Sequence, residues 1–282
     1  MKYNLVFLMA ITGIIVTSCN SGNPKNANKA IADTLVSKLS TKDTGTIKDG
    51  QIQIFYNMYL SVEMSSLFKS IGVVYNSNLL NPSGKVEKYN TSADKAMNLG
   101  VYAVDLSYCK YFEQFEQASK YLKNMQKLSS EMGIPDEQFF LSVKRIETNI
   151  SNKDSLVKIA NELYVSTDKY LKDNERGNSA ALIILGGWTE ALYIATNLDK
   201  NESNDVELLS RIAEQKYSLV NLLNLLKKYE NDKIIQVYIK KLIDLQTSFT
   251  KFNLDEKHKD KTYEQLKEIR TKILIIRKEI VS

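Results

Sequence analysis

Two carboxylates lie inside otherwise apolar stretches of the sequence, and their position makes them the first residues to test for chemistry. Asp105 lies in the apolar segment 96–108, and Glu190 lies in the apolar segment 179–195. Two carboxylates that face one cavity could act as a general acid and base, or bind a hard cation. Buried carboxylates also link helices, with Tyr, Lys or Arg side chains as partners. The structural role is the commoner one, and we expect it here.

Helical spacing places aromatic side chains beside both carboxylates. Tyr102 precedes Asp105 by three residues, and Tyr193 follows Glu190 by three, so each pair shares one face of a helix. Trp188 lies in the same segment as Glu190. These five residues are the candidate ligand-binding or buried polar residues. Most of the 16 Tyr lie among Leu and Ile on helical faces, where an aromatic ring usually packs in the core.

The sequence gives little sign of other site chemistry. A single His argues against a His-based zinc site, and we expect no metal site, no cofactor and no catalytic residue. Cys109 lies in an apolar helix, far along the chain from His258, so we expect a buried structural thiol. The net charge of +5 is spread among acidic residues. The basic stretch 257–261 has no aromatic residue and contains Asp260, which favours a solvated loop between helices over nucleic-acid binding.

The N-terminus carries a targeting signal. Lys2 precedes a run from Leu5 to Val16 that is apolar except for Thr12 and Gly13. This run has the length of a signal-peptide core and is too short to cross a bilayer as a helix, which takes about 20 residues. The sequence that follows it, Val-Thr-Ser-Cys, resembles the lipobox of bacterial lipoproteins, although Leu is commoner than Val at its first position. The resemblance implies that Cys19 is lipidated and becomes the first residue of the mature chain.

The chain is therefore expected to have three parts. Residues 1–18 are the lipoprotein signal peptide, residues 19–50 are the lipidated Cys and a flexible tether, and residues 51–282 are a single α-helical domain. The tether begins with small polar residues and contains no Asp or Glu between Asn20 and Asn28. Some lipoproteins of the Bacteroidota carry an acidic surface-export signal there. Its absence favours a lipid anchor in the outer membrane, with the domain facing the periplasm.

The composition and the periodicity both predict an all-α fold. Only 11 Gly and 3 Pro occur, too few for the frequent turns of a β-rich chain. Apolar residues recur every three or four positions, as on one face of a helix. The four stripes are Ala118, Tyr121, Met125, Leu128 and Met132; Leu208, Ile212, Gln215, Leu219, Leu222 and Leu226; Ile235, Tyr238, Leu242, Leu245, Phe249 and Phe252; and Leu266, Ile269, Ile273, Ile276 and Ile280.

We expect a multi-helix bundle of about eight to ten antiparallel helices, because the connections between them are short. Gly133 before Ile134-Pro135 predicts a helix stop with a left-handed cap, residues 81–84 predict a turn, and Ser92 and Ser203 are candidate N-caps. The expected helices are 28–40, 52–71, 92–111, 113–132, 136–150, 153–172, 178–198, 204–229, 231–252 and 262–281.

Two of these helices are apolar on nearly every side and are expected at the centre of the bundle. They also resemble each other. Leu99-Gly100 aligns with Leu185-Gly186, and Leu106 aligns with Leu192. The chain could therefore consist of two related four-helix halves, although two core helices can also be alike by chance. Glycine inside a helix allows a neighbouring helix to approach closely or leaves room for a ligand, and we favour close packing.

Segments 99–122 and 181–198, behind a lipobox, resemble a family of all-helical envelope lipoproteins from Bacteroidota that has no assigned activity. The resemblance implies an envelope location and an all-helical fold, and it brings no catalytic residue. We expect a non-enzymatic protein-interaction or structural module with an envelope protein partner and no nucleic acid. The alternatives are a small-ligand protein that binds a glycan, peptide or lipid in a cleft between the two central helices, and a carboxylate-based hydrolase.

Overall fold

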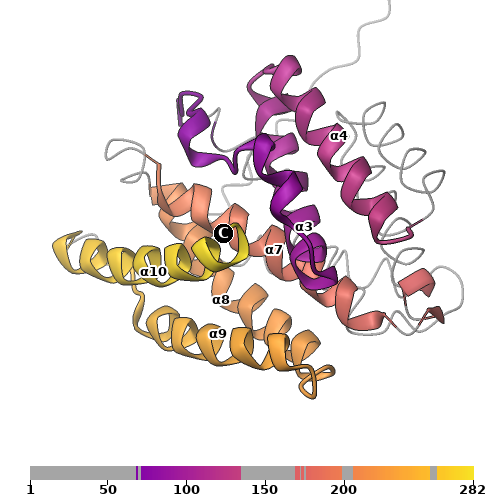
Figure 1. Cartoon of the computed structure of the whole chain (residues 1–282). Coiled ribbons are helices and arrows are strands. Elements are labelled where there is room, and N and C mark those ends of the chain that lie inside the picture. The colour runs from indigo at the N-terminus through magenta and orange to yellow at the C-terminus, as the bar shows by residue number, and fades with distance from the viewer. Residues whose placement is uncertain are drawn as a thin grey trace, which may run out of the picture. The chain divides into compact units, whose positions relative to one another are not determined.

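The structure is a computed structural model that describes residues 68, 71–134, 169–171, 173–174, 176–198, 206–254 and 259–282, all within one compact unit, Lys48–Ser282. These residues form helices and no strands, which confirms the all-α bundle (Figure 1). The described helices are the 3-10 helices η1 (Ser77–Leu79) and η2 (Ser83–Lys88) and the α-helices α3 (Ser92–Tyr111), α4 (Phe115–Glu131), α7 (Gly177–Thr196), α8 (Val206–Lys227), α9 (Lys233–Lys251) and α10 (Lys259–Ile280).

Helix α7 lies at the centre of the described part of the bundle. It packs against α3 most extensively, and it also packs against α8 and α10. Helix α9 contacts α8 and α10, so α7, α8, α9 and α10 form a closed four-helix group, while α4 packs on α3 (Figure 1). The prediction that the two most apolar segments form central helices is confirmed, since most residues of α3 and α7 are buried.

The stripes read from the sequence form the core of the bundle. Every residue of the four predicted stripes is buried, including the polar Gln215 on α8. Removing one such aliphatic or aromatic side chain from water stabilises the fold by about 1.5–3 kcal/mol. Because the apolar residues repeat every three or four positions, each helix can bury them only by turning one face inward.

Helices α3 and α7 touch through their glycines. A Cβ atom on Gly100 would lie 2.0 Å from the carbonyl oxygen of Ile183, and a Cβ on Gly186 would lie 1.9 Å from that of Met97. In each helix the contacted carbonyl belongs to the residue three positions before the partner glycine, so the crossing is locally two-fold symmetric. These distances confirm close packing as the reason for the glycines.

The predicted repeat of two four-helix halves stays a prediction. The second group, α7–α10, is a four-helix group in the structure. Of the first group only α3 and α4 are described, because the expected helix 136–150 and nearly all of 153–172 lie outside the described residues. The expected helix 28–40 and most of 52–71 also lie outside them.

Several helix starts differ from the predicted ones. The N-cap of α3 is Thr91 and not Ser92: its hydroxyl accepts from the Asp94 N–H, and the Asp94 side chain accepts from the Thr91 N–H in a capping box. The turn predicted at 81–84 leads at Ser83 into η2. Helix α10 begins at Lys259, so the end of the stretch that we expected to be a loop is helical. The other candidate N-cap, Ser203, lies outside the described residues.

Helices α3 and α4 end in the same way. The left-handed cap predicted at Gly133 is confirmed by its φ of 66°, and after α3 the corresponding residue is Glu113, with a φ of 59°. At both ends the residue after the left-handed one donates its N–H to a carbonyl five positions back, from Gln114 to Cys109 and from Ile134 to Ser129. Left-handed φ favours glycine, so a glutamate at position 113 does not predict a cap there.

Replacing Glu113 by Gly is expected to stabilise the chain by about 0.5–1 kcal/mol, because the left-handed conformation costs a residue with a Cβ about 1–2 kcal/mol and the greater freedom of an unfolded glycine offsets part of the gain. Gly133→Ala is the matched control and should destabilise the chain by about 1 kcal/mol. Urea unfolding of both variants measures the two effects. Changes of the same sign in the two variants would contradict the assigned cap geometry.

Candidate functional site

The centre of the bundle contains an ion pair that is almost completely shielded from water. Glu190 of α7 is fully buried, and Arg277 of α10 is 8% exposed. Arg277 donates from Nε to Glu190 Oε2 at 2.6 Å and from Nη2 to Glu190 Oε1 at 2.7 Å. The guanidinium also lies 4.0 Å from the centre of the Tyr193 ring, which adds a cation–π contact. This planar, two-bond arrangement joins α7 to α10.

Asp105 of α3 completes a three-residue cluster with Glu190 and Arg277, which we call the central triad. Asp105 is fully buried, and its Oδ2 accepts from the Asn81 N–H at 3.2 Å. The Asp105 and Glu190 side chains lie within hydrogen-bonding reach of each other. Burial, and then the negative charge of Glu190, raise the pKa of Asp105 well above its usual value. Two buried carboxyl groups therefore lie near one arginine, whose guanidinium donates to Glu190 at both oxygens.

Glu190 and Arg277 form a charged pair. Burial raises the pKa of Glu190, and its bonds to Arg277 offset only part of this rise. Burial lowers the pKa of Arg277, but the contact with Glu190 outweighs it and the net shift is upward. The guanidinium is therefore charged, and it stabilises the ionised form of the carboxylate that it binds at both oxygens.

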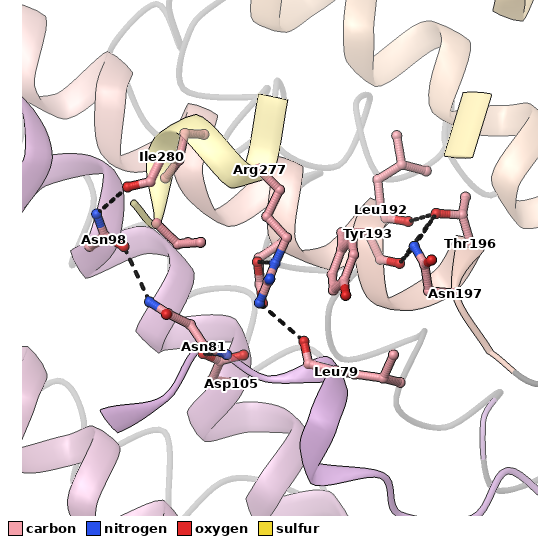
Figure 2. A network of polar contacts seen from close by, with 12 residues as sticks. Leu79, Asn81, Asn98, Asp105, Leu192, Tyr193, Thr196, Asn197, Arg277 and Ile280 are labelled. Carbon is pink, nitrogen blue, oxygen red and sulfur yellow. Dashed lines mark hydrogen bonds and ion pairs between the residues drawn. The ribbon is translucent and has the colours of Figure 1, made fainter. Parts of the chain in front are cut away.

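The central triad also holds the loop between η1 and η2 and the C-terminal end of the chain (Figure 2). Arg277 Nη2 donates to the Leu79 carbonyl at 3.1 Å. Asn98 Nδ2 donates to the carbonyl of Ile280, and Asn98 Oδ1 accepts from Asn81 Nδ2. These bonds join residues up to 198 positions apart in the sequence. The triad and Asn98 together tie the C-terminal end of α10 to α3 and to the loop.

The other two candidate residues, Tyr102 and Trp188, have no hydrogen bond to the central triad. Tyr102 is fully buried, and its hydroxyl donates to the Pro82 carbonyl at 3.3 Å. Trp188 is buried, and its Nε1–H has no hydrogen-bond partner, nor has the buried hydroxyl of Thr189. The structure thus brings Asp105, Glu190 and Tyr193 together around Arg277, and it places Trp188 outside this hydrogen-bonded cluster.

Cys109 is a buried free thiol, as predicted. Its sulfur lies 3.8 Å from the Tyr75 hydroxyl, and the Tyr75 ring contacts the rings of Tyr108 and Phe112. Burial raises the pKa of the Cys109 thiol to about 11, so the group is protonated at neutral pH and is a poor nucleophile.

The sequence analysis missed Arg277, although it named Tyr, Lys and Arg side chains as partners for buried carboxylates. A signal was present in the sequence. Arg277 follows Ile273 by four positions and precedes Ile280 by three, so it lies on the buried face of α10 with the apolar stripe. A positive charge on such a face requires a buried partner of opposite charge, and Glu190 supplies it.

The chemistry open to the central triad follows from its contacts. Arg277 occupies both oxygens of Glu190, so the place of a bound cation is taken by a side chain. In the ranges that the structure describes, no three His, Cys, Asp or Glu side chains gather in a group that could hold a metal ion. The triad is arranged to link α3, α7 and α10, which is the structural role expected for the two carboxylates.

The chain matches no family model, and searches of curated proteins and of solved structures found no similar protein. Of the described helices, α7 alone is long and apolar enough to cross a membrane, and most of it is buried in the bundle. A core helix has the same properties, and α7 has three described helices packed around it. The conclusions about function below therefore depend on the residues and contacts of this chain.

Proposed function

We propose that this protein is an envelope lipoprotein, anchored through lipidated Cys19 in the outer membrane and facing the periplasm, whose helical domain is a non-enzymatic protein-interaction or structural module. This proposal includes the resemblance to helical envelope lipoproteins of Bacteroidota. The anchor residue lies outside the described residues, and its support is the sequence pattern of Leu5–Val16 followed by a small-residue stretch and Cys19.

The observation that carries the non-enzymatic role is the contact between Glu190 and Arg277. Glu190 has both oxygens bound to the guanidinium and no exposed surface. A general acid or base must come within hydrogen-bond reach of a substrate. Using this carboxylate for catalysis would mean breaking a buried ion pair, which costs several kcal/mol.

The geometry supports the small-ligand alternative less well. A ligand between the two central helices needs space where α3 and α7 cross, but their backbones touch at Gly100 and Gly186. Among the five residues named from the sequence, two buried polar atoms have no hydrogen-bond partner, the Trp188 Nε1–H and Asp105 Oδ1. A rise in melting temperature with added glycans, peptides or lipids, which Trp188→Phe abolishes, would favour the alternative.

The outer helices offer a surface for a protein partner. Ile234 and Val237 lie three residues apart on α9, where they share one helix face and are 41% and 47% exposed. A partner could cover these side chains without disturbing the core. Cross-linking from position 237 in intact cells tests this: a defined adduct that Ile234→Lys abolishes supports the interaction role, and the absence of any adduct favours a structural one.

Replacing Cys19 by Ala is expected to move the protein from the membrane fraction to the soluble fraction, or to leave an uncleaved precursor. Acylation and signal-peptide cleavage both depend on that thiol in lipoproteins, and an unacylated chain loses about 0.8 kcal/mol of membrane binding for each CH₂ that would have been buried. Fractionation of cells and radiolabelling with palmitate measure the change.

Cys109→Ala is the matched control, because it removes the buried thiol and leaves the lipobox intact. It should fractionate like the wild type. If Cys19→Ala fractionates with the membrane as the wild type does, the proposed anchor is wrong.

A further inference from the structure

We propose that Asp105 is protonated in the folded chain and donates its proton to the Glu190 carboxylate, so that the central triad is a neutral, proton-binding unit that makes folding depend on pH. Nothing in the proposed envelope function requires this property. It follows from how three buried side chains share their donors and acceptors.

One hydrogen-bond acceptor of the triad has no donor. Asp105 Oδ2 accepts from the Asn81 N–H, whereas Asp105 Oδ1 is buried and faces no N–H or O–H donor. The same carboxyl lies within hydrogen-bonding reach of the Glu190 side chain. Two ionised carboxylates repel each other and have no proton to share, while a proton on Oδ1 makes Asp105 a donor for a hydrogen bond to Glu190.

The charges around Asp105 lead to the same conclusion. The titratable groups that face it are Glu190 from α7, Arg277 from α10, Tyr121 from α4, Tyr75 and Tyr89 from the segment before α3, and Tyr102 and Cys109 from α3 itself. Burial raises the pKa of each of these phenols and of the thiol, so all of them are neutral. Among these described groups Arg277 is the one cation, and it faces two carboxyl groups.

The proton belongs on Asp105 rather than on Glu190. Arg277 donates to both oxygens of Glu190, which stabilises the ionised carboxylate, while Asp105 accepts a single neutral N–H. With one proton on Asp105, the triad contains one positive and one negative charge in direct contact. An ionised Asp105 would add a second buried negative charge, which would be strongly unfavourable.

The sign of the pH dependence follows from this arrangement. In the unfolded chain an Asp carboxyl has a pKa of about 3.9, and in the folded chain the pKa of Asp105 is well above that value. When the pH lies between these two pKa values, folding therefore takes up one proton. The stabilisation is complete below about pH 4 and is lost as the pH rises toward the folded-state pKa of Asp105.

The test measures urea unfolding of the full chain between pH 5 and pH 9 for wild type, Asp105→Asn and Asp244→Asn. An amide has the shape of a protonated carboxyl and can donate to Glu190, so Asp105→Asn should fold. The wild-type folding constant should fall, relative to that of Asp105→Asn, by about tenfold for each pH unit below the folded-state pKa. Asp244→Asn removes an exposed carboxylate paired with Lys272 and should keep the wild-type slope.

A second measurement observes the proton itself. The infrared spectrum of the folded wild type at neutral pH should contain the carbonyl band of a protonated carboxyl, and Asp105→Asn should lack it. Parallel pH slopes for wild type and Asp105→Asn, or a wild-type spectrum without the band, would overturn the proposal. Failure of Asp105→Asn to fold would also count against it, since the amide replaces the proposed donor.

Discussion

The full chain with Glu190→Gln should lose about 3–5 kcal/mol of stability to unfolding, the typical cost when one partner of a buried ion pair is removed. Glutamine keeps the size of the side chain and can still accept one bond from Arg277, but it carries no charge. The Arg277 guanidinium would then be buried without the carboxylate to which its Nε and Nη2 now donate. Urea or thermal unfolding measures the loss, and it should remove a large part of the stability of a domain of this size.

Glu279→Gln is the matched control for this variant. Glu279 pairs with Lys241 on the surface, and its side chain is 42% exposed, so water replaces the lost contact. This change should cost less than about 1 kcal/mol. If Glu190→Gln and Glu279→Gln lose equal stability to unfolding, the buried pair contributes no more than a surface pair. The structural role of the triad would then be wrong.

The helical core could be predicted because its signal is local. A stripe such as Ile269, Ile273 and Ile276 repeats with the period of an α-helix, and a helix can remove those side chains from water only by turning that face inward. The period depends on backbone geometry and not on the identity of the neighbouring helix. The stripes therefore gave the buried faces correctly without any knowledge of which helices pack together.

The ends of the helices were less predictable. Glycine at position 133 marks a left-handed cap because glycine adopts that conformation easily, and the structure has the cap there. The same cap at Glu113 gives no such signal, since its left-handed backbone is imposed by the bonds that close the turn after α3. Thr91 and Ser92 are both good caps by type, and the choice of Thr91 depends on which hydroxyl reaches the Asp94 N–H.

The central triad was predictable in part. A carboxylate in an apolar helix marks a buried polar contact from sequence alone, and the sequence analysis placed both carboxylates at the centre. Their meeting could not be predicted, because Asp105 and Glu190 are 85 positions apart and their proximity depends on how α3 crosses α7. Arg277, on yet another helix, completes the cluster only once α10 packs on α7.

Gly100→Ala and Gly186→Ala should each destabilise the chain by about 3 kcal/mol or more, because the added methyl group meets backbone atoms that cannot turn away. The nearest atoms would lie 2.0 Å and 1.9 Å from the new Cβ, which forces α3 and α7 apart. This cost outweighs the gain of about 1 kcal/mol that alanine brings inside a helix. Thermal or urea unfolding of the full chain measures it.

Two other glycines serve as controls. A Cβ on Gly187 would lie 3.3 Å from the Gly100 carbonyl oxygen, a contact that a small shift relieves, and a Cβ on Gly84 would meet nothing within 4 Å. Gly187→Ala should therefore cost much less than the two large effects, and Gly84→Ala should stay within about 0.5 kcal/mol of wild type. If all four Gly→Ala variants change the stability by the same amount, the backbones of α3 and α7 are not in contact.

The double variant Gly100→Ala with Gly186→Ala tests whether both glycines act at one crossing. Each added methyl group would press on the backbone of the other helix, three residues before the partner glycine. Once the first has separated α3 from α7, the second meets a wider gap and costs less. The combined loss should therefore be smaller than the sum of the single losses, by about 0.5–3 kcal/mol, as expected for residues in contact. Strictly additive losses would mean that the two glycines relieve separate contacts, and the locally two-fold crossing would be wrong.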